Sequence, residues 1–360
     1  MNVYITGVGG LIGSTVAEEA VKRGHRVWGC DNDNRGKWFG VKGSTGWRCK
    51  ELANHGVTVH ACDFRFAPEL VQEADLIVHC ASQPSHDWSR ANPIQDSLVN
   101  YMGTVELLEA TRRMSPGAVF VFMSTNKVYG DVVNSYEYSK NGDRDEPANR
   151  WMAEHGVHEF HGLDRSLHTP FGVSKTAADL MVQEFRRCYG LQTVCFRCGC
   201  LTGSGGTAVE MQGFLGWLVK KAVAGEKYTV YGWGGYQVRD NIDATDVADA
   251  VFRYAVWPKG SVYNMGGGYC NAISIREAVS YLRDKHSLDF DVDWDGPARV
   301  GDHHWWVTDT KLFEDDYRGW RRKSVYEVID AMVIGERRSR EPEGEDATLS
   351  PGFDETSGIQ

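Results

Sequence analysis

The sequence lacks an excess of positive charge, a long apolar run and an even set of cysteines. Its 360 residues carry a net charge of -10. This argues against a surface for nucleic acids or anionic membranes, because phosphate binding needs clustered Lys and Arg. Every apolar run is shorter than the roughly 18 residues that span a bilayer. The nine cysteines lie mostly inside apolar runs, which is typical of a reducing compartment. We expect a cytoplasmic protein with no nucleic-acid or membrane partner.

The sequence does contain a series of short apolar strands that alternate with helical segments. Strands are expected at residues 3–6, 26–30, 57–62, 74–80, 118–124 and 192–197, and helices at 14–23, 104–114 and 171–189. Such alternation is typical of βαβ units, in which helices cover both faces of a parallel sheet. The predicted fold class is α/β: a doubly wound, Rossmann-type parallel sheet with a smaller C-terminal α/β lobe.

A glycine-rich turn joins the first expected strand to the first helix. Gly7, Gly10 and Gly13 are spaced three apart, with Leu11 and Ile12 between the last two. Glycines let the backbone approach a pyrophosphate closely, and the helix N-terminus supplies amide donors and partial positive charge. Glycine spacing alone also fits a flexible loop, but its place between strand and helix predicts a dinucleotide site.

Asp31 ends the second expected strand, 18 positions after Gly13, where an acid binds a ribose diol. A carboxylate facing a 2′-phosphate would repel it by an energy on the order of several kcal/mol. Arg35 would offset only part of this repulsion, so the sequence favours NAD over NADP. Asp63 follows the third strand, where it meets either the adenine edge or solvent. The other contacts expected at this end of the cofactor are Asn32 and Phe64.

The chain divides into three predicted parts. Residues 1–201 form the NAD-binding Rossmann domain, and residues 202–336 form mainly a substrate lobe, with some segments returning to the sheet. Short strands are expected in the lobe near 228–231 and 261–265. Residues 337–360 are rich in Glu, Ser, Gly and Pro, and we expect them to be a disordered tail.

Several motifs together resemble the extended short-chain dehydrogenase/reductase superfamily. Besides the glycine turn, they are Ala-Ser-Gln-Pro-Ser-His-Asp-Trp at 81–88, Ser-Thr-Asn-Lys-Val-Tyr-Gly at 124–130, Gln-Val-Arg-Asp at 237–240 and Gly-Gly-Gly at 266–268. The first two look most similar to the nucleotide-sugar 2-epimerases that act on CDP-paratose. The resemblance runs from residue 1 to about 333.

The chain departs from this superfamily at Phe171. In a Tyr-x-x-x-Lys frame both side chains share a helical face, so the ammonium lowers the pKa of the phenol, which then takes a substrate proton. Here Phe171 precedes Lys175 by four, which keeps the ring without its oxygen. Two explanations remain: a natural subgroup built around a bare ring, or a Tyr-to-Phe substitution.

The resemblance implies roles for the remaining motif residues. Thr125 would hydrogen-bond a sugar hydroxyl, and Lys175 would hold the nicotinamide ribose. Asn100 would brace the backbone of the active site. Relatives usually dimerise through a helical bundle that includes the Lys175 helix, so a homodimer is expected. The implied cofactor contacts after the fourth and fifth strands are Ala81, Ser82, Gln83 and Ser124.

The same resemblance implies that two arginines clamp the substrate diphosphate. These are Arg239 and Arg299, and the planar guanidinium is suited to phosphate. An ion pair with Asp240 or Asp243 is the alternative for Arg239. Asn126 is expected beside the sugar. The related 4,6-dehydratases place an acid and a base where this chain has Asn126 and Lys127, so elimination of water is disfavoured.

Four side chains compete for the role of the missing phenol. Lys127 beside a second lysine would have a lowered pKa and act as a base; alternatively it is solvated or binds phosphate. His86 titrates near neutrality with Asp87 to orient it; alternatively it is a satisfied loop histidine. The weaker candidates are His168 and Tyr129.

Three histidines, at 155, 158 and 161, would lie on roughly one face of a helix and could grip a metal. The sequence offers no second cluster to complete a coordination shell, so no metal is predicted.

These observations predict an enzyme that epimerises a nucleotide-diphosphate sugar, at C2, through a transient ketosugar and with NAD as cofactor. Two alternatives remain. One is 4-epimerisation or dehydration of such a sugar. The other is a non-catalytic protein that binds NAD or a nucleotide sugar, which the missing phenol suggests.

Overall fold

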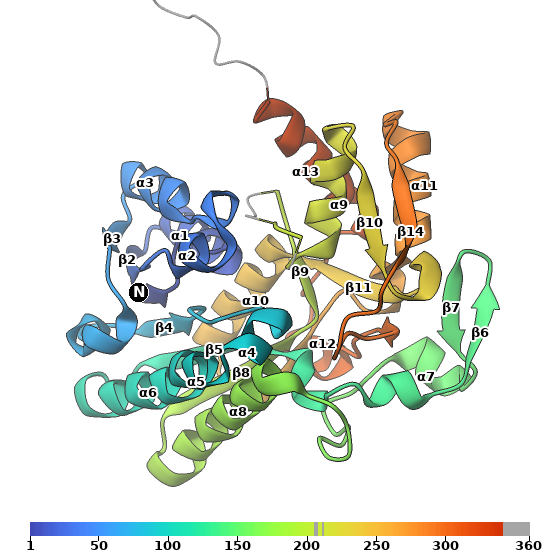
Figure 1. The fold of residues 1–360 in the computed structure, drawn as a ribbon. Coiled ribbons are helices and arrows are strands. Elements are labelled where there is room, and N and C mark those ends of the chain that lie inside the picture. The colour runs from blue at the N-terminus through green and yellow to red at the C-terminus, as the bar shows by residue number, and fades with distance from the viewer. Residues whose placement is uncertain (205–207, 211, 341–360) are drawn as a thin grey trace, which may run out of the picture.

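The computed structural model describes residues 1–204, 208–210 and 212–340 (Figure 1). Its centre is a seven-stranded sheet of order β12-β8-β5-β4-β1-β2-β3, in which all neighbouring pairs are parallel. This confirms the predicted doubly wound α/β sheet. The strands are β1 (Asn2–Thr6), β2 (Arg26–Cys30), β3 (Thr58–His60), β4 (Leu76–His79), β5 (Val119–Thr125), β8 (Gln192–Cys198) and β12 (Val262–Met265).

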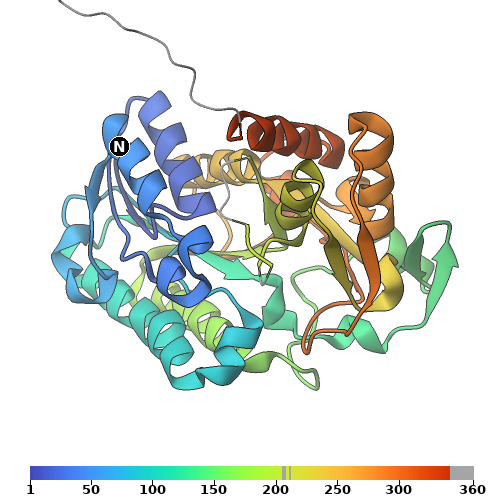
Figure 2. The same ribbon diagram turned by 45° about the horizontal axis from the view of Figure 1, so that its top comes forward.

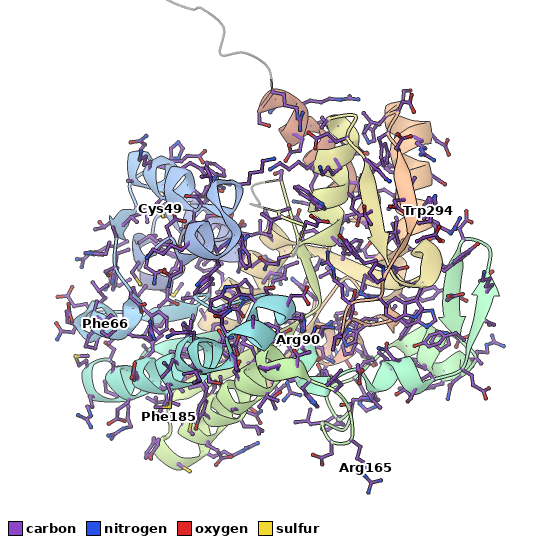
Figure 3. All side chains as sticks on the ribbon, in the orientation of Figure 1. Cys49, Phe66, Arg90, Arg165, Phe185 and Trp294 are labelled. Atoms are coloured by element: carbon purple, nitrogen blue, oxygen red, sulfur yellow. The ribbon has the colours of Figure 1, made fainter. Side chains whose placement is uncertain are left out.

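Helices cover both faces of this sheet because successive strand residues point to opposite sides. In β1, Val3 and Ile5 pack with α1 (Leu11–Lys22), α3 (Gly46–Asn54) and α10 (Ala244–Val256). Tyr4 points the other way, towards a core shared with α6 (Gly103–Met114) and α8 (Thr169–Tyr189). In Figure 3, Phe185 lies on α8 in this second core.

The smaller lobe has its own core beside the carboxyl ends of the sheet (Figure 2). Its helices are α9 (Phe214–Val223), α11 (Ile275–His286) and α13 (Val325–Arg338), whereas α12 (Lys311–Asp316) packs through Phe313 on the core of the central sheet. Its strands are β9 (Cys200–Thr202), β10 (Tyr228–Tyr231), β11 (Val238–Asp243), β13 (Ala272–Ser274), β14 (Val292–Gly296) and β15 (Trp305–Trp306). We expected a lobe in this region with some segments returning to the sheet, and we placed the strand near 261–265 in the lobe. In the structure that strand is β12, which forms one edge of the central sheet, and α10 also packs on this sheet.

One part of the first 201 residues lies with the lobe instead of the sheet. The hairpin of β6 (Tyr138–Asn141) and β7 (Arg144–Pro147) contacts β11 and β13, next to α7 (Arg150–His155). The bidentate ion pair of Arg144 with Glu277, at 2.7 Å, fixes the hairpin to α11. Sequence patterning alone does not reveal such a contact, because the pairing partners are 133 residues apart.

The predicted tail, 337–360, lies mostly outside the described residues. The helix α13 continues to Arg338, so the first residues of that segment are helical. Within 1–204, 208–210 and 212–340, no helix is long and apolar enough to cross a membrane.

Candidate active site

A cleft of about 490 Å³ lies at the carboxyl ends of the central strands, where they face the lobe. This is the edge at which open α/β sheets bind ligands. Apart from the weaker acid/base candidates Tyr129 and His168, all but two of the predicted site residues line the cleft. The role of each lining residue stays a prediction. The predicted residues that line the cleft are Gly7, Gly10, Leu11, Ile12, Gly13, Asp31, Asn32, Arg35, Asp63, Phe64, Ala81, Ser82, His86, Ser124, Thr125, Asn126, Lys127, Phe171, Lys175, Arg239 and Arg299.

The glycine turn brings backbone amides to one end of the cleft. Gly7 has φ of 66°, a left-handed conformation that favours glycine, and its amide donates to the Cys30 carbonyl at 2.8 Å. A Cβ on Gly13 would lie 2.3 Å from the Gly7 carbonyl oxygen, so α1 packs against the turn only with glycine there. The open N-terminus of α1, capped by Gly10 without a side-chain bond, is free to donate to a pyrophosphate.

Asp31 lies beside this turn at the end of β2. Its carboxylate accepts three hydrogen bonds, from the Gly9 amide at 3.0 Å, the Thr45 hydroxyl at 2.9 Å and the Asp33 amide at 2.9 Å. A carboxylate has about four acceptor positions, so it retains capacity for a ribose hydroxyl. The turn and Asp31 together fit the pyrophosphate and ribose of a dinucleotide.

Asp63 and Arg35 border the same end of the cleft. Asp63 accepts from the Asn32 side chain at 3.0 Å and pairs with Arg65 at 2.8 Å. Burial opposes its ionisation, but the hydrogen bonds from Arg65 outweigh this and lower the pKa of Asp63. The Arg35 guanidinium donates to Gln212 of the lobe, so it reaches across the cleft and not only towards Asp31.

The other two predicted residues, Gln83 and Asn100, are buried and hydrogen-bonded to each other. The Asn100 side chain accepts from the Gln83 amide at 2.8 Å and donates to the Gln83 carbonyl at 3.0 Å. Asn100 lies in η4 (Leu98–Met102), a π-helical turn of the kind often found at functional sites. The bracing role of Asn100 stays a prediction, and both Asn100 and Gln83 stand apart from the described cleft lining.

Phe171 and Lys175 lie one helical turn apart on α8, as the frame predicts. The Lys175 ammonium donates to the Met123 carbonyl at 2.7 Å and lies 4.1 Å from the centre of the Phe122 ring. Burial lowers the pKa of Lys175 to about 8. Phe171 is 7% exposed and its ring meets the His86 ring edge-on, with centroids 4.9 Å apart.

His86 opens α4 (His86–Ala91) next to the bare ring. Its Nδ1 lies 2.9 Å from the Thr169 hydroxyl, so the predicted orienting role of Asp87 is wrong; Asp87 instead lies 3.9 Å from Arg90. Burial, with the charge of Lys127, lowers the pKa of His86 to about 3. The imidazole is therefore neutral near pH 7 and a weak proton acceptor.

Lys127 is buried in η5 (Asn126–Tyr129), which rules out the predicted alternative of a solvated side chain. The Thr125 hydroxyl accepts from its amide at 3.2 Å, and its ammonium donates to the Gly301 carbonyl at 2.8 Å. Burial lowers the pKa of Lys127 to about 8, Asp302 acts against this change, and Arg239 adds to it. The cause is thus burial and an arginine, and not a second lysine as the sequence suggested.

The two arginines face the cleft from the lobe. Arg239 pairs with Asp302 at 2.8 Å, so the predicted alternative of a pair with Asp240 or Asp243 is wrong. Arg299 donates to the Glu210 carbonyl at 3.0 Å and lies 3.9 Å above the Tyr231 ring. Two cations that line the same cleft suit a diphosphate.

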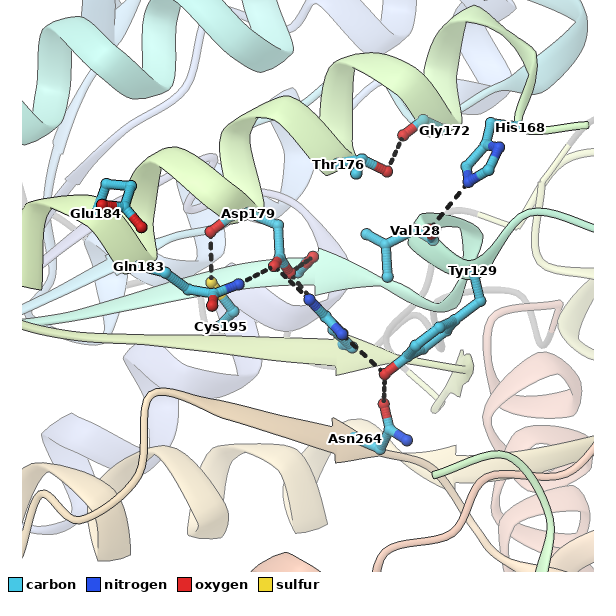
Figure 4. Close-up of polar contacts among 12 residues, drawn as sticks. Val128, Tyr129, His168, Gly172, Thr176, Asp179, Gln183, Glu184, Cys195 and Asn264 are labelled. Carbon is cyan, nitrogen blue, oxygen red and sulfur yellow. Dashed lines mark hydrogen bonds and ion pairs between the residues drawn. The ribbon is translucent and has the colours of Figure 1, made fainter. Parts of the chain in front are cut away.

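The two weaker acid/base candidates, Tyr129 and His168, contact groups that do not line the cleft (Figure 4). The Tyr129 hydroxyl donates to Asn264 at 2.8 Å and accepts from Arg197 at 3.0 Å, and burial raises the pKa of Tyr129 to about 12. His168 lies 3.0 Å from the Val128 carbonyl. Both stand apart from the cleft lining in the described part of the chain, so they do not replace the phenol.

The three spaced histidines do not share a helix. Only His155 belongs to α7, where it stacks on Trp151, while His158 and His161 follow in a loop. Within the described residues, no group of three or more His, Cys, Asp or Glu side chains is placed to hold a metal.

Two residues at or near the cleft were not found from the sequence: Asp302, which lines it, and Thr169, which contacts the lining residue His86. Thr169 has φ of 61°, a strained conformation for this residue type, and it holds His86. Asp302 joins Arg239 to the Lys127 environment. The only sequence signal for Asp302 is its position three residues after Arg299.

The fold and the cleft define a Rossmann-type dinucleotide-binding protein. The chain belongs to the NAD dependent epimerase/dehydratase family, whose sequence pattern matches residues 3–266, and NAD is its cofactor. It is 32% identical over 328 residues to the CDP-paratose 2-epimerase of Salmonella typhi, covering 86% of this chain and 92% of that protein.

Solved structures of sugar-nucleotide epimerases share this fold. The UDP-glucose 4-epimerase of Thermotoga maritima, solved with UDP-glucose, matches with a TM-score of 0.75 and 22% identity over 94% of this chain and 99% of that chain. The Thermus thermophilus UDP-glucose 4-epimerase, solved with NAD, matches with a TM-score of 0.73 and 26% identity over the same shares.

Proposed function

We propose that the protein epimerises a nucleotide-diphosphate sugar at C2. The observation that carries this proposal is one cleft that joins the glycine turn and Asp31 to Arg239 and Arg299, with Lys127 and Phe171 also in its wall. The similarity to a CDP-paratose 2-epimerase supports C2 as the reacting centre. Asn126 and Lys127, in place of an acid and a base, disfavour dehydration.

In this proposal each group of residues has a separate task. NAD, when bound, supplies a transient acceptor and donor of hydride, so that the sugar carbinol passes through a ketone. Arg239 and Arg299 hold the diphosphate, and Thr125 hydrogen-bonds the sugar. Lys127, as the neutral amine, takes the hydroxyl proton and later returns it. Its lowered pKa suits this task near neutrality, whereas neutral His86 serves as a hydrogen-bond partner.

The direct test is to mix the NAD-loaded protein with CDP-, UDP-, GDP- and dTDP-sugars and to identify products by NMR. Inversion at C2 of one of these sugars supports the proposal. Inversion at C4, or a 4-keto or unsaturated product, would assign the alternative chemistry. Binding without any product would assign a non-catalytic nucleotide-sugar protein.

The role of Asp31 predicts the cofactor preference. Wild type should bind NAD more tightly than NADP in calorimetry, and Asp31→Ala should narrow the difference because the carboxylate no longer repels a 2′-phosphate. Asp63→Ala is the matched control, since it should change both affinities alike. Equal affinity of wild type for the two dinucleotides would show that Asp31 does not face the ribose.

Restoring the phenol should do little. We expect Phe171→Tyr to change turnover by less than about tenfold, because in this proposal the site already uses another base. If the site instead lacked an acid/base, restoring the phenol would raise turnover by about 10²–10⁴-fold. The new hydroxyl would also enter the contact between Phe171 and His86. A gain in the larger range, measured as kcat on the sugar found above, would instead identify a tyrosine site with a substitution.

We further propose a homodimer, formed through α5 (Pro93–Ser97), η4 and α8. These helices contact one another and carry exposed apolar side chains, which mark interaction surfaces. They are Ile94, Leu98, Met102, Val173 and Leu180. We also place the protein in the cytoplasm, because all nine of its cysteines, each within the described residues, are free thiols.

The dimer is tested by placing charge on this surface. Light scattering should find wild type as a dimer and the Val173→Asp, Leu180→Asp double variant as a monomer. Val256→Asp on α10, where the side chain is 75% exposed, is the matched control and should leave the mass unchanged. A wild-type monomer, or a double variant that remains dimeric, would contradict this surface.

A further inference from the structure

The ammonium of Lys127 is held by a segment of the lobe that is distant in sequence. Its hydrogen-bond acceptor is the Gly301 carbonyl, at 2.8 Å. The next residue, Asp302, turns its carboxylate to Arg239, also at 2.8 Å, and accepts the amide of His303 at 2.8 Å. Arg239 donates in addition to the His303 carbonyl. One carboxylate therefore organises the short stretch that carries the acceptor of Lys127.

We propose that Asp302 is a positioning residue for Lys127: clamped by Arg239 and the His303 amide, it fixes the Gly301 carbonyl on the ammonium and supplies the negative charge facing it. This inference rests on the proposed function, because it gives Lys127 the proton-transfer role. It goes beyond that function because it names Asp302 as the group that controls the protonation of Lys127.

The charges around Lys127 come from several elements. Asp302 favours the ammonium form, as does the more weakly acting Asp131 after η5, while Arg239 of β11 opposes it. The other titratable groups facing Lys127 are Cys200 of β9, His86 of α4 and His303. Burial raises the pKa of Cys200 to about 12, and burial lowers the pKa values of both histidines, so these three are neutral near pH 7. Asp302 and Arg239 are thus the two neighbours whose charges affect the pKa of Lys127 most.

Asp302 and Arg239 also connect the proposed diphosphate site to Lys127. Asp302 is an ionised carboxylate: burial opposes this state, but Arg239 and Lys127 lower the pKa of Asp302 below its usual range. A diphosphate bound at Arg239 competes with Asp302 for one guanidinium. Removing the carboxylate should therefore free Arg239 for phosphate and also lower the affinity of Lys127 for its proton.

The test measures Lys127 directly and does not depend on turnover. In NAD-loaded, full-length protein with ¹³C-labelled lysine, the Cε signal that disappears in Lys127→Met is followed by NMR against pH. We expect Asp302→Asn to move this titration to lower pH by about one unit, the scale of a nearby opposite charge. Asp131→Asn, the matched control, should cause a smaller shift of the same sign. Arg239→Gln should move the titration to higher pH.

Two further readouts distinguish positioning from a general structural defect. The acid limb of kcat/KM should shift with the NMR titration in Asp302→Asn, and Asp302→Glu should restore both. CDP, UDP and dTDP should each be tried in calorimetry, where the one that binds wild type should bind Asp302→Asn more tightly.

The outcomes separate the two proposals. An unmoved Lys127 titration in Asp302→Asn overturns the role of Asp302, whatever the enzyme turns over. If Asp302→Asn does not fold, Arg239→Gln decides, and a shift to lower pH or no shift overturns the inference. Shifts as expected, without turnover of any sugar nucleotide, would support the inference and refute the proposed function.

Discussion

Replacing Lys127 with methionine is expected to lower kcat/KM by about 10²–10⁴-fold, the usual contribution of a positioned general acid/base. NAD binding should be retained, because the ammonium of Lys127 contacts Gly301 and interacts with Asp302 and Arg239 of the lobe, and not with the glycine turn or Asp31. Lys311→Met is the matched control: this lysine forms an exposed pair with Asp315 and should leave the rate unchanged. Rates are measured on the sugar nucleotide identified by NMR.

Lys127→Arg distinguishes a base from a phosphate-binding cation. Arginine keeps the positive charge but does not lose its proton in proteins, so it should be as inactive as methionine if Lys127 is the base. Recovery of most of the rate in Lys127→Arg would show that only the charge matters.

The pH dependence of kcat/KM in the wild type also tests whether Lys127 is the base. Only the neutral amine accepts a proton, and with a pKa of about 8 its fraction grows as pH rises. The value of kcat/KM should therefore rise towards a plateau above pH 8 and be about 100-fold lower at pH 6, two units below the pKa. A histidine base with a pKa of about 3, as for His86, would give no such change between pH 6 and 8.

The dinucleotide end of the site was accessible from the sequence because its determinants are local. Gly7 to Gly13 lie within one strand–turn–helix unit, and Asp31 ends the adjacent strand. In a parallel sheet the carboxyl ends of neighbouring strands share an edge, so placing the strands also placed these residues. The alternation of strands and helices gave the sheet for the same reason.

The part of the site that we propose for proton transfer was harder to predict from the sequence because its contacts join distant segments. Thr169 reaches His86 across 83 residues, and Lys127 reaches Gly301 across 174. The sequence offered Asp87, which is adjacent to His86, and a second lysine expected in the same site, but the structure gives His86 and Lys127 other partners. The neutral state of His86 and the lowered pKa of Lys127 both arise from burial, which only the packed structure defines.

A buried network beneath the cleft was also not found from the sequence (Figure 4). Asp179 of α8, fully buried, pairs with Arg197 of β8 at 2.8 Å and accepts the Ser124 hydroxyl at 2.6 Å. Arg197 donates in turn to the Tyr129 hydroxyl at 3.0 Å. These bonds tie α8 to β5, β8 and η5, the elements that carry Lys175, Ser124 and Lys127.

Asp179→Ala is expected to lower the free energy of unfolding by about 3–5 kcal/mol, measured by urea denaturation, because it leaves the guanidinium of Arg197 buried without its counter-charge. Exchanging both partners for apolar residues, in Asp179→Leu with Arg197→Met, should cost less than either single change, since no charge then remains to be desolvated. Glu184→Ala on the exposed side of α8, where Glu184 pairs with Arg187, is the matched control and should cost less than about 1 kcal/mol. A double variant less stable than Asp179→Ala would mean that the pair stabilises the fold by its own attraction. If the double variant is more stable than either single variant, as expected, the pair contributes to the specificity of packing. Each charge is then tolerated in the core only because the other is present. Together they fix the position of α8 under the cleft.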